Sequence, residues 1–256
     1  MFLDSVDPIN ATLYRLIITV GVGVLVVAFI GIIVQIYLAI SYIKYNRKAN
    51  SLGKTGEEIA REILDKNNLN HIRVSATGSL TFGNSYSHYF KKVRLRRLTY
   101  RKKSITSLAM ACQKSSLAIM DAEGDPDMRK RVILTPIIFF GPLSIIPLIL
   151  IGIALDILVF KTDGIWTMIF AIIAASFYLL SFVMQVLQIK TEKKAQNKAI
   201  EMMERDNLAT LEEINLCKSL YRLYNIEYIN NLVLEILQLI LKILQITSKS
   251  YNSSKK

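Results

Sequence analysis

The sequence predicts a mainly α-helical membrane protein that carries one small β-sheet outside the lipid. Hydrophobic residues make up 52% of the 256 residues, which is more than in an ordinary soluble domain. They gather in long stretches that contain no charged residue, and most of the positive charge lies between the first two of these stretches. This composition excludes a soluble globular enzyme and a disordered chain. With two cysteines and two histidines, the chain also cannot be a disulfide scaffold or hold a histidine-rich metal site.

Three uncharged stretches are long enough to cross a membrane. They cover residues 16–43, 132–155 and 164–189, and each exceeds the roughly 20 residues that a spanning helix needs. The first is too long to be the core of a cleaved signal peptide, so we interpret it as a retained anchor. The second and third are separated by a short polar segment and are expected to form a transmembrane hairpin that turns at residues 161–163.

A fourth apolar stretch, residues 229–246, contains Glu235 and Lys242. It could span the membrane, lie in the interface or pack against the other helices. The predicted organisation is therefore a tail and anchor (1–43), an α+β segment (44–131), a transmembrane hairpin (132–189), a helical segment (190–228), and an apolar helix with a polar tail (229–256).

Charge indicates the orientation in the membrane. Residues 44–131 contain 19 basic and 8 acidic side chains, which is +11 of the total net charge of +12. The positive-inside rule then predicts a multi-pass protein of the cell membrane with an external N-terminus. Residues 44–131 and 190–228 would be cytoplasmic. The expected partners are the lipid bilayer itself and either anionic lipid headgroups or another membrane protein. Nucleic acid is not expected, because no aromatic residues are interleaved with the charge. The basic residues expected to meet headgroups are Lys91, Lys92, Arg94, Arg96, Arg97, Arg101, Lys102 and Lys103.

The segment between the first two stretches has a readable order of elements. Thr55 and Glu58 have the spacing of a capping box and predict a helix that ends near residues 67–68. Alternating apolar residues predict two or three short strands between residues 71 and 97. A second helix is expected from Ser104 to about Met120, where a charged segment ends it. The chain from Glu192 onward is predicted to be helical, with a break at residues 208–210.

These elements, in this order, resemble the YugP-like membrane zinc metallopeptidases of bacteria over roughly residues 45–245. The matching motifs are residues 55–69, Gly78-x-Leu80-Thr81, Val93-Arg94-Leu95, Ser104-Ile105 with Ala109, Ala111, Ala118 and Ile119, and finally Leu220 and Tyr228. The resemblance implies a catalytic helix with the motif H-E-x-x-H, in which two histidines bind zinc and the glutamate activates water. It also implies a third zinc ligand, a glutamate after the hairpin.

This chain departs from the family at the catalytic positions. Aligned on Ala118 and Ile119, Gln113 and Leu117 stand where the histidines would be, and Lys114 replaces the glutamate. Glu192 matches the third ligand, but Lys194 stands at an aspartate position nearby. No H-E-x-x-H occurs elsewhere in the chain. We therefore expect no zinc, no other cofactor and no catalytic residue. The alternative, an active membrane zinc metallopeptidase with displaced ligands, stays open.

Other chemistry could occupy the same helix. Lys114 with Ser115 or Ser116 suggests a Ser–Lys dyad, although neighbouring residues on a helix point in different directions. Cys112 is expected to be a packed small hydrophobe, and the histidines His71 and His88 are expected to lie on the surface or in a loop. Lys114 and Glu192 could be two separate solvated charges.

If the family's fold is kept, these two residues would instead lie close together. We predict an ion pair between Lys114 and Glu192 in place of the metal, with Gln113 donating to the same carboxylate.

Overall fold

The computed structural model describes residues 8–78 and 83–253, and these are mainly helical. The chain divides into two compact units. The first contains α1 (Pro8–Arg47) up to Ile43 and α8 (Leu211–Ser253) from Leu220. The second contains residues 44–219 and holds every position of the predicted catalytic site. Leu80 and Thr81, from one motif of the family resemblance, lie outside the described residues.

In the described part of the chain, three helices are long and apolar enough to cross a membrane. They are Ile9–Arg47, Ile165–Arg205 and Leu211–Lys249. The anchor helix and the second arm of the hairpin were expected, and the fourth apolar stretch also belongs to a helix of this length. The side chains of these helices are largely exposed, as lipid-facing residues would be.

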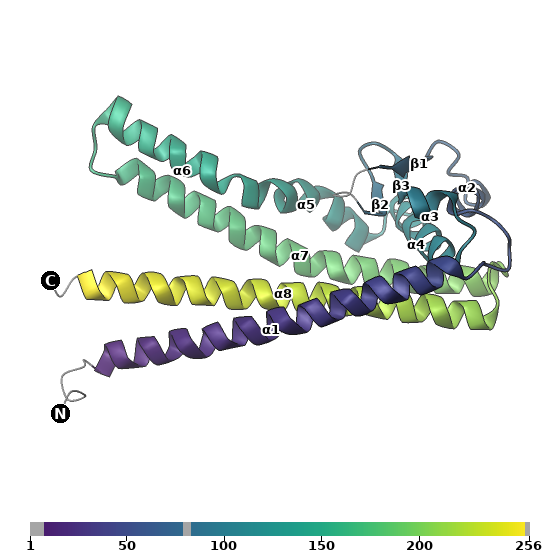
Figure 1. The fold of residues 1–256 in the computed structure, drawn as a ribbon. Helices are drawn as coiled ribbons and strands as arrows, with labels where there is room; N and C mark the ends of the chain where they lie inside the picture. The colour runs from purple at the N-terminus through teal and green to yellow at the C-terminus, as the bar shows by residue number, and fades with distance from the viewer. Residues whose placement is uncertain (1–7, 79–82, 254–256) are drawn as a thin grey trace. The chain divides into compact units, whose positions relative to one another are not determined.

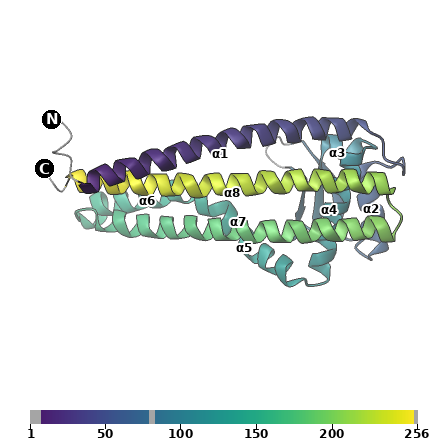
Figure 2. The ribbon, with the colours of Figure 1, turned by 90° about the horizontal axis from the view of Figure 1, so that it is seen from below.

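The first arm of the hairpin differs from the single helix that the uncharged stretch suggests. It consists of α5 (Pro126–Leu143), α6 (Ile145–Ala154) and a π-helix, η1 (Leu155–Phe160), with a turn at Ser144 between the first two. Proline cannot donate a backbone hydrogen bond and disfavours helix continuation before it, and Pro142 and Pro147 flank the break. Both α5 and α6 pack along α7 (Ile165–Arg205), which is one unbroken helix (Figures 1 and 2).

The hairpin is held together near its turn by a buried carboxylate and a close helix contact. Asp156 accepts hydrogen bonds from the backbone N–H groups of Trp166 and Thr167 at the start of α7, at 3.1 and 2.8 Å. Those N–H groups have no partner within the helix, so Asp156 caps α7 from the opposite arm. A Cβ at Gly152 would lie 2.7 Å from the Thr167 Cα, so only glycine permits this approach.

The sheet has three short strands, as predicted. β1 (Arg73–Thr77) pairs in parallel with β3 (Lys92–Arg96), and β3 pairs antiparallel with β2 (Ser85–Ser87). Val93 and Leu95 point from β3 into the core, whereas the alternate residues are less buried. This period-2 pattern is what the sequence indicated.

Helices cover the buried side of the sheet. The capping box of Thr55 and Glu58 starts α2 (Gly56–Lys66), which buries Ile59, Ile63 and Leu64. After β3 comes the short α3 (Arg97–Arg101), and then α4 (Ile105–Ala122), which Ser104 caps. Every residue of α4 from Ile105 to Met120 is buried, so this helix is the centre of the unit. The predicted breaks after Met120 and at residues 208–210 are confirmed.

Candidate functional site

The three positions that the family resemblance aligns with the catalytic motif lie on the central helix α4. Gln113, Lys114 and Leu117 are all buried, and Leu117 has no exposed surface. Gln113 and Leu117 are one helical turn apart, which is the spacing that two metal ligands on one helix face require. Helix α4 packs directly against α7, the helix that carries Glu192.

Glu192 contacts two of the side chains at these aligned positions. Its Oε2 accepts hydrogen bonds from the Nε2 of Gln113 at 2.8 Å and from the Nζ of Lys114 at 3.0 Å. The side chains of Lys114 and Glu192 are each only 6% exposed. The predicted ion pair and the predicted role of Gln113 are therefore confirmed, and the alternative of two separate solvated charges is wrong.

A second cation, which the sequence analysis missed, completes the site. The Nη1 of Arg131 donates to the other carboxylate oxygen of Glu192 at 2.7 Å, and the Arg131 side chain is 11% exposed. We call Gln113, Lys114, Arg131 and Glu192 the Glu192 cluster. Arg131 directly precedes the uncharged stretch of the first arm (132–155), and Glu192 follows shortly after that of the second arm (164–189). Since the arms of a hairpin are antiparallel, this pairing could have been inferred.

Electrostatics favours the ionised carboxylate despite its burial. Burial raises the pKa of Glu192, but the positive charges of Lys114 and Arg131 outweigh it and bring the pKa down to about 2. Burial lowers the pKa of Lys114, the charge of Glu192 opposes this, and Arg131 adds to the lowering. The cluster therefore pairs one buried carboxylate with the buried Lys114 and the mostly buried Arg131.

Lysines on α7 pair with acidic residues between the end of α4 and the first turn of α5. Lys190 lies 3.1 Å from Asp127, Lys194 pairs with Asp125, and Lys198 pairs with Glu123. Lys194, which the resemblance aligns with an aspartate, thus faces acidic residues rather than the Glu192 cluster. The lysines recur every four residues, so they share one helix face. The four-residue spacing of the lysines and the nearby acidic segment are both visible in the sequence, so this pairing could have been inferred from it.

A second carboxylate with several partners lies at the end of α4. Asp121 accepts hydrogen bonds from the Tyr86 hydroxyl at 2.6 Å and is 2.7 Å from the Nδ1 of His88, while the Nζ of Lys91 is 3.2 Å away. We call these four residues the Asp121 cluster. His88 lies in the turn between β2 and β3, as expected for a loop histidine, and its bond to Asp121 was not anticipated. His71 is exposed, as expected.

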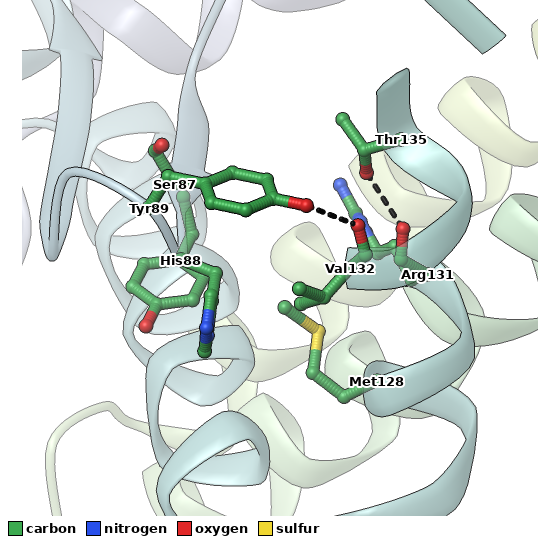
Figure 3. A pocket seen from close by; sticks show the side chains of 8 residues that line it. Ser87, His88, Tyr89, Met128, Arg131, Val132 and Thr135 are labelled. Carbon is green, nitrogen blue, oxygen red and sulfur yellow. Dashed lines mark hydrogen bonds between the residues drawn. The ribbon is translucent and has the colours of Figure 1, made fainter. Parts of the chain in front are cut away.

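The β2–β3 turn comprises residues 88–91. A small cavity of about 70 Å³ lies between this turn and the start of α5 (Figure 3). One wall is formed by Tyr86, His88 and Tyr89, and the other includes Met128, Arg131 and Thr135. Arg131 therefore belongs both to this cavity and to the Glu192 cluster, and His88 links the cavity to the Asp121 cluster. Both clusters therefore contribute residues to the lining of this cavity.

The remaining candidates on α4 do not form a nucleophilic site. The hydroxyl of Ser116 donates to the Cys112 carbonyl, and that of Ser115 has no hydrogen-bond partner among the described residues, so neither is bonded to Lys114. Cys112 is fully buried, and burial raises the pKa of its thiol, which suits a packed side chain rather than a nucleophile. Within residues 8–78 and 83–253, no group of three or more His, Cys, Asp or Glu side chains could hold a metal ion.

Comparison with protein families gives one match to most of the chain. The model of a family described as "Putative neutral zinc metallopeptidase" matches residues 20–247. Comparisons with curated proteins and with solved structures found no significant match. The family match agrees with the resemblance carried by the motifs of residues 45–245. This chain therefore belongs to the neutral zinc metallopeptidase family.

Proposed function

We propose that this chain is a catalytically silent member of its family that acts as a non-catalytic binding or regulatory protein in the cell membrane. One observation carries the proposal: both oxygens of the Glu192 carboxylate are already bonded to side chains of the protein. In the family that the chain resembles, the matching glutamate would bind zinc. Here Lys114 and Arg131 supply the positive charge beside it.

The residues of the Glu192 cluster do not fit a zinc ion. A catalytic zinc site needs three protein ligands and an open position for water. Leu117 has no donor atom, and the amide of Gln113 already donates to Glu192. An ammonium at the position of Lys114 would repel a metal cation and cannot act as a general base while it is charged. We therefore derive no hydrolytic step for this site.

The proposed orientation follows the charge distribution of the chain. The N-terminus would be outside, and residues 44–131 and 190–228 would be in the cytoplasm, with the lipid bilayer as the immediate partner. Single cysteines test this, since Cys112 and Cys217 are both buried. An impermeant thiol reagent should label D163C in intact cells but L211C only after permeabilisation. Labelling of L211C in intact cells would reverse the orientation.

Metal content and proteolysis test the loss of activity. We expect the purified protein to contain less than stoichiometric zinc and to show no chelator-sensitive cleavage of casein. Zinc bound at one ion per chain together with such cleavage would refute the proposal and favour an active metallopeptidase with displaced ligands.

Restoring the motif tests whether the scaffold still resembles a zinc site. The variant Q113H/K114E/L117H, with R131M to free the Glu192 carboxylate, should take up zinc. The matched variant Q113H/K114E/R131M lacks the second histidine and should take up much less. Equal uptake by the two variants would show that the metal binds elsewhere.

A further inference from the structure

The positions of the charged residues on α5 and α7 indicate where the membrane surface would lie on the second unit. On α5 the charged residues end at Arg131, and on α7 they resume at Lys190 after the uncharged stretch. The two ends are joined by the contacts of Asp127 with Lys190 and of Arg131 with Glu192, at 3.1 and 2.7 Å. Both arms of the hairpin therefore change from polar to apolar at the same level. If the hairpin is embedded in lipid, as proposed above, this level is the membrane surface.

The β2–β3 turn lies at that level. The hydroxyl of Tyr89 donates a hydrogen bond to the carbonyl oxygen of Val132, the first residue of the uncharged stretch, at 3.1 Å (Figure 3). Tyr89 is 61% exposed and the adjacent Phe90 is 70% exposed. Single exposed apolar residues are common on soluble surfaces. Two neighbouring exposed aromatics at the polar–apolar boundary of a membrane hairpin are instead typical of an interfacial anchor.

Basic side chains surround the two aromatics. Lys91 and Lys92 follow them directly, and the guanidinium carbon of Arg94 lies 5.5 Å from the centre of the Phe90 ring. Such a cation–π contact lets an arginine stay at the headgroup level while the ring beneath it is in an apolar environment. The charge of this turn complements an anionic lipid surface.

The turn is fixed before any membrane contact. His88 is bonded to Asp121, and the backbone N–H of Lys91 donates to the His88 carbonyl at 3.2 Å. The carbonyl of Lys91 in turn accepts from the Arg73 N–H at 2.9 Å, and Lys91 itself has a φ of 42°. A left-handed residue in a turn bonded on both sides holds Tyr89 and Phe90 in one orientation, so little conformational entropy is lost on binding.

From these observations we infer that the β2–β3 turn is a membrane anchor, in which Phe90 inserts at the boundary between headgroups and acyl chains and Lys92 and Arg94 bind anionic headgroups. The inference rests on the proposed membrane insertion of the hairpin, and it adds a second, separate contact of the unit with lipid. It also gives the Asp121 cluster a role, because that cluster positions the turn.

An environment-sensitive fluorophore attached at F90C tests the anchor in the full-length protein. In nanodiscs of phosphatidylcholine with phosphatidylserine, its emission should shift to shorter wavelength and be quenched when the lipids are brominated. L211C is the matched control, because Leu211 is 73% exposed in the same unit and lies 22 positions after the uncharged stretch, in the segment proposed to be cytoplasmic. V183C, on the exposed face of the hairpin helix α7, reports whether the hairpin itself is in lipid.

The outcomes separate the anchor from the membrane hairpin. Quenching at positions 183 and 90 but not at 211 supports the anchor. Quenching at 183 alone refutes the anchor and leaves the hairpin in place, whereas no quenching at 183 overturns both. A shifted emission at 90 without quenching would indicate contact with protein instead of lipid. Removing phosphatidylserine, or introducing K92Q/R94Q, should reduce the quenching at 90 and leave that at 183 unchanged.

Discussion

Asp121 and Glu192 are both buried carboxylates, but they differ in how their cations are placed. Their side chains are 8% and 6% exposed. The Lys114 and Arg131 side chains beside Glu192 are 6% and 11% exposed, whereas the His88 and Lys91 side chains beside Asp121 are 36% and 45% exposed. When an exposed charge loses its partner, water solvates it and the fold loses little stability. A buried charge that loses its partner stays without solvation, so the loss of stability is larger. The burial of the cation, rather than that of the carboxylate, should therefore decide how much each contact contributes to stability.

Removing the Glu192 carboxylate should have the largest effect. E192M leaves Lys114 and Arg131 as two buried cations without a counter-charge, and we expect it to lower the free energy of unfolding by ~3–5 kcal/mol. Chemical denaturation in detergent measures this loss. The control E212M removes an exposed partner of Lys48 and should cost ~0–1 kcal/mol. Similar losses for the two variants would contradict the importance of buried cations.

Removing one cation should lower the free energy of unfolding less than removing the carboxylate does. K114M leaves Glu192 bonded to Arg131 and Gln113, so we expect a loss of ~2–3 kcal/mol, close to one charged hydrogen bond. A double-mutant cycle of K114M with E192M gives the coupling between the pair. If K114M destabilises the protein as much as E192M, then Arg131 does not share the carboxylate as the structure indicates.

The Asp121 cluster should contribute less, and its contribution should depend on pH. D121N keeps the shape of the side chain but loses the charge, so we expect the free energy of unfolding to fall by ~1–2 kcal/mol at neutral pH.

The pH dependence follows from the pKa of Asp121. Burial raises this pKa, but hydrogen bonds from Tyr86, His88 and Lys91 outweigh it and lower the pKa below the ordinary value of 3.8. A lowered carboxyl pKa stabilises the fold above the unfolded value and ceases to do so as the pH falls through the folded value. The difference between D121N and the unmodified protein should therefore shrink as the pH falls below ~4. A difference that does not change with pH would show that Asp121 acts through its shape alone.

Removing Lys91 should have the smallest effect. Its ammonium is largely solvated, so K91M should cost ~0–1 kcal/mol, and added salt should reduce even this difference. Unfolding at low and high ionic strength measures it. A salt-independent loss as large as that of K114M would remove the contrast between the two clusters.

Much of the local structure could be predicted because it depends on short-range chemistry. Thr55 and Glu58 identify the start of α2, and alternating residues identify β3. The break at Ser144 was missed because length and hydropathy were considered without the prolines that flank it. Arg131 was missed for a different reason: its partner is 61 positions away in the sequence, and the family motif gives no position for it.

The sequence by itself determined that this chain has membrane-length apolar helices, a family motif order and no H-E-x-x-H. These properties depend on residue type and spacing, which a linear chain displays directly. Only the tertiary structure decided which charges meet. Packing of α4 and α5 against α7 brought Lys114 and Arg131 to Glu192, and the end of α4 brought Asp121 to His88. Such contacts join residues far apart in the chain, and their strength depends on burial that no single segment controls.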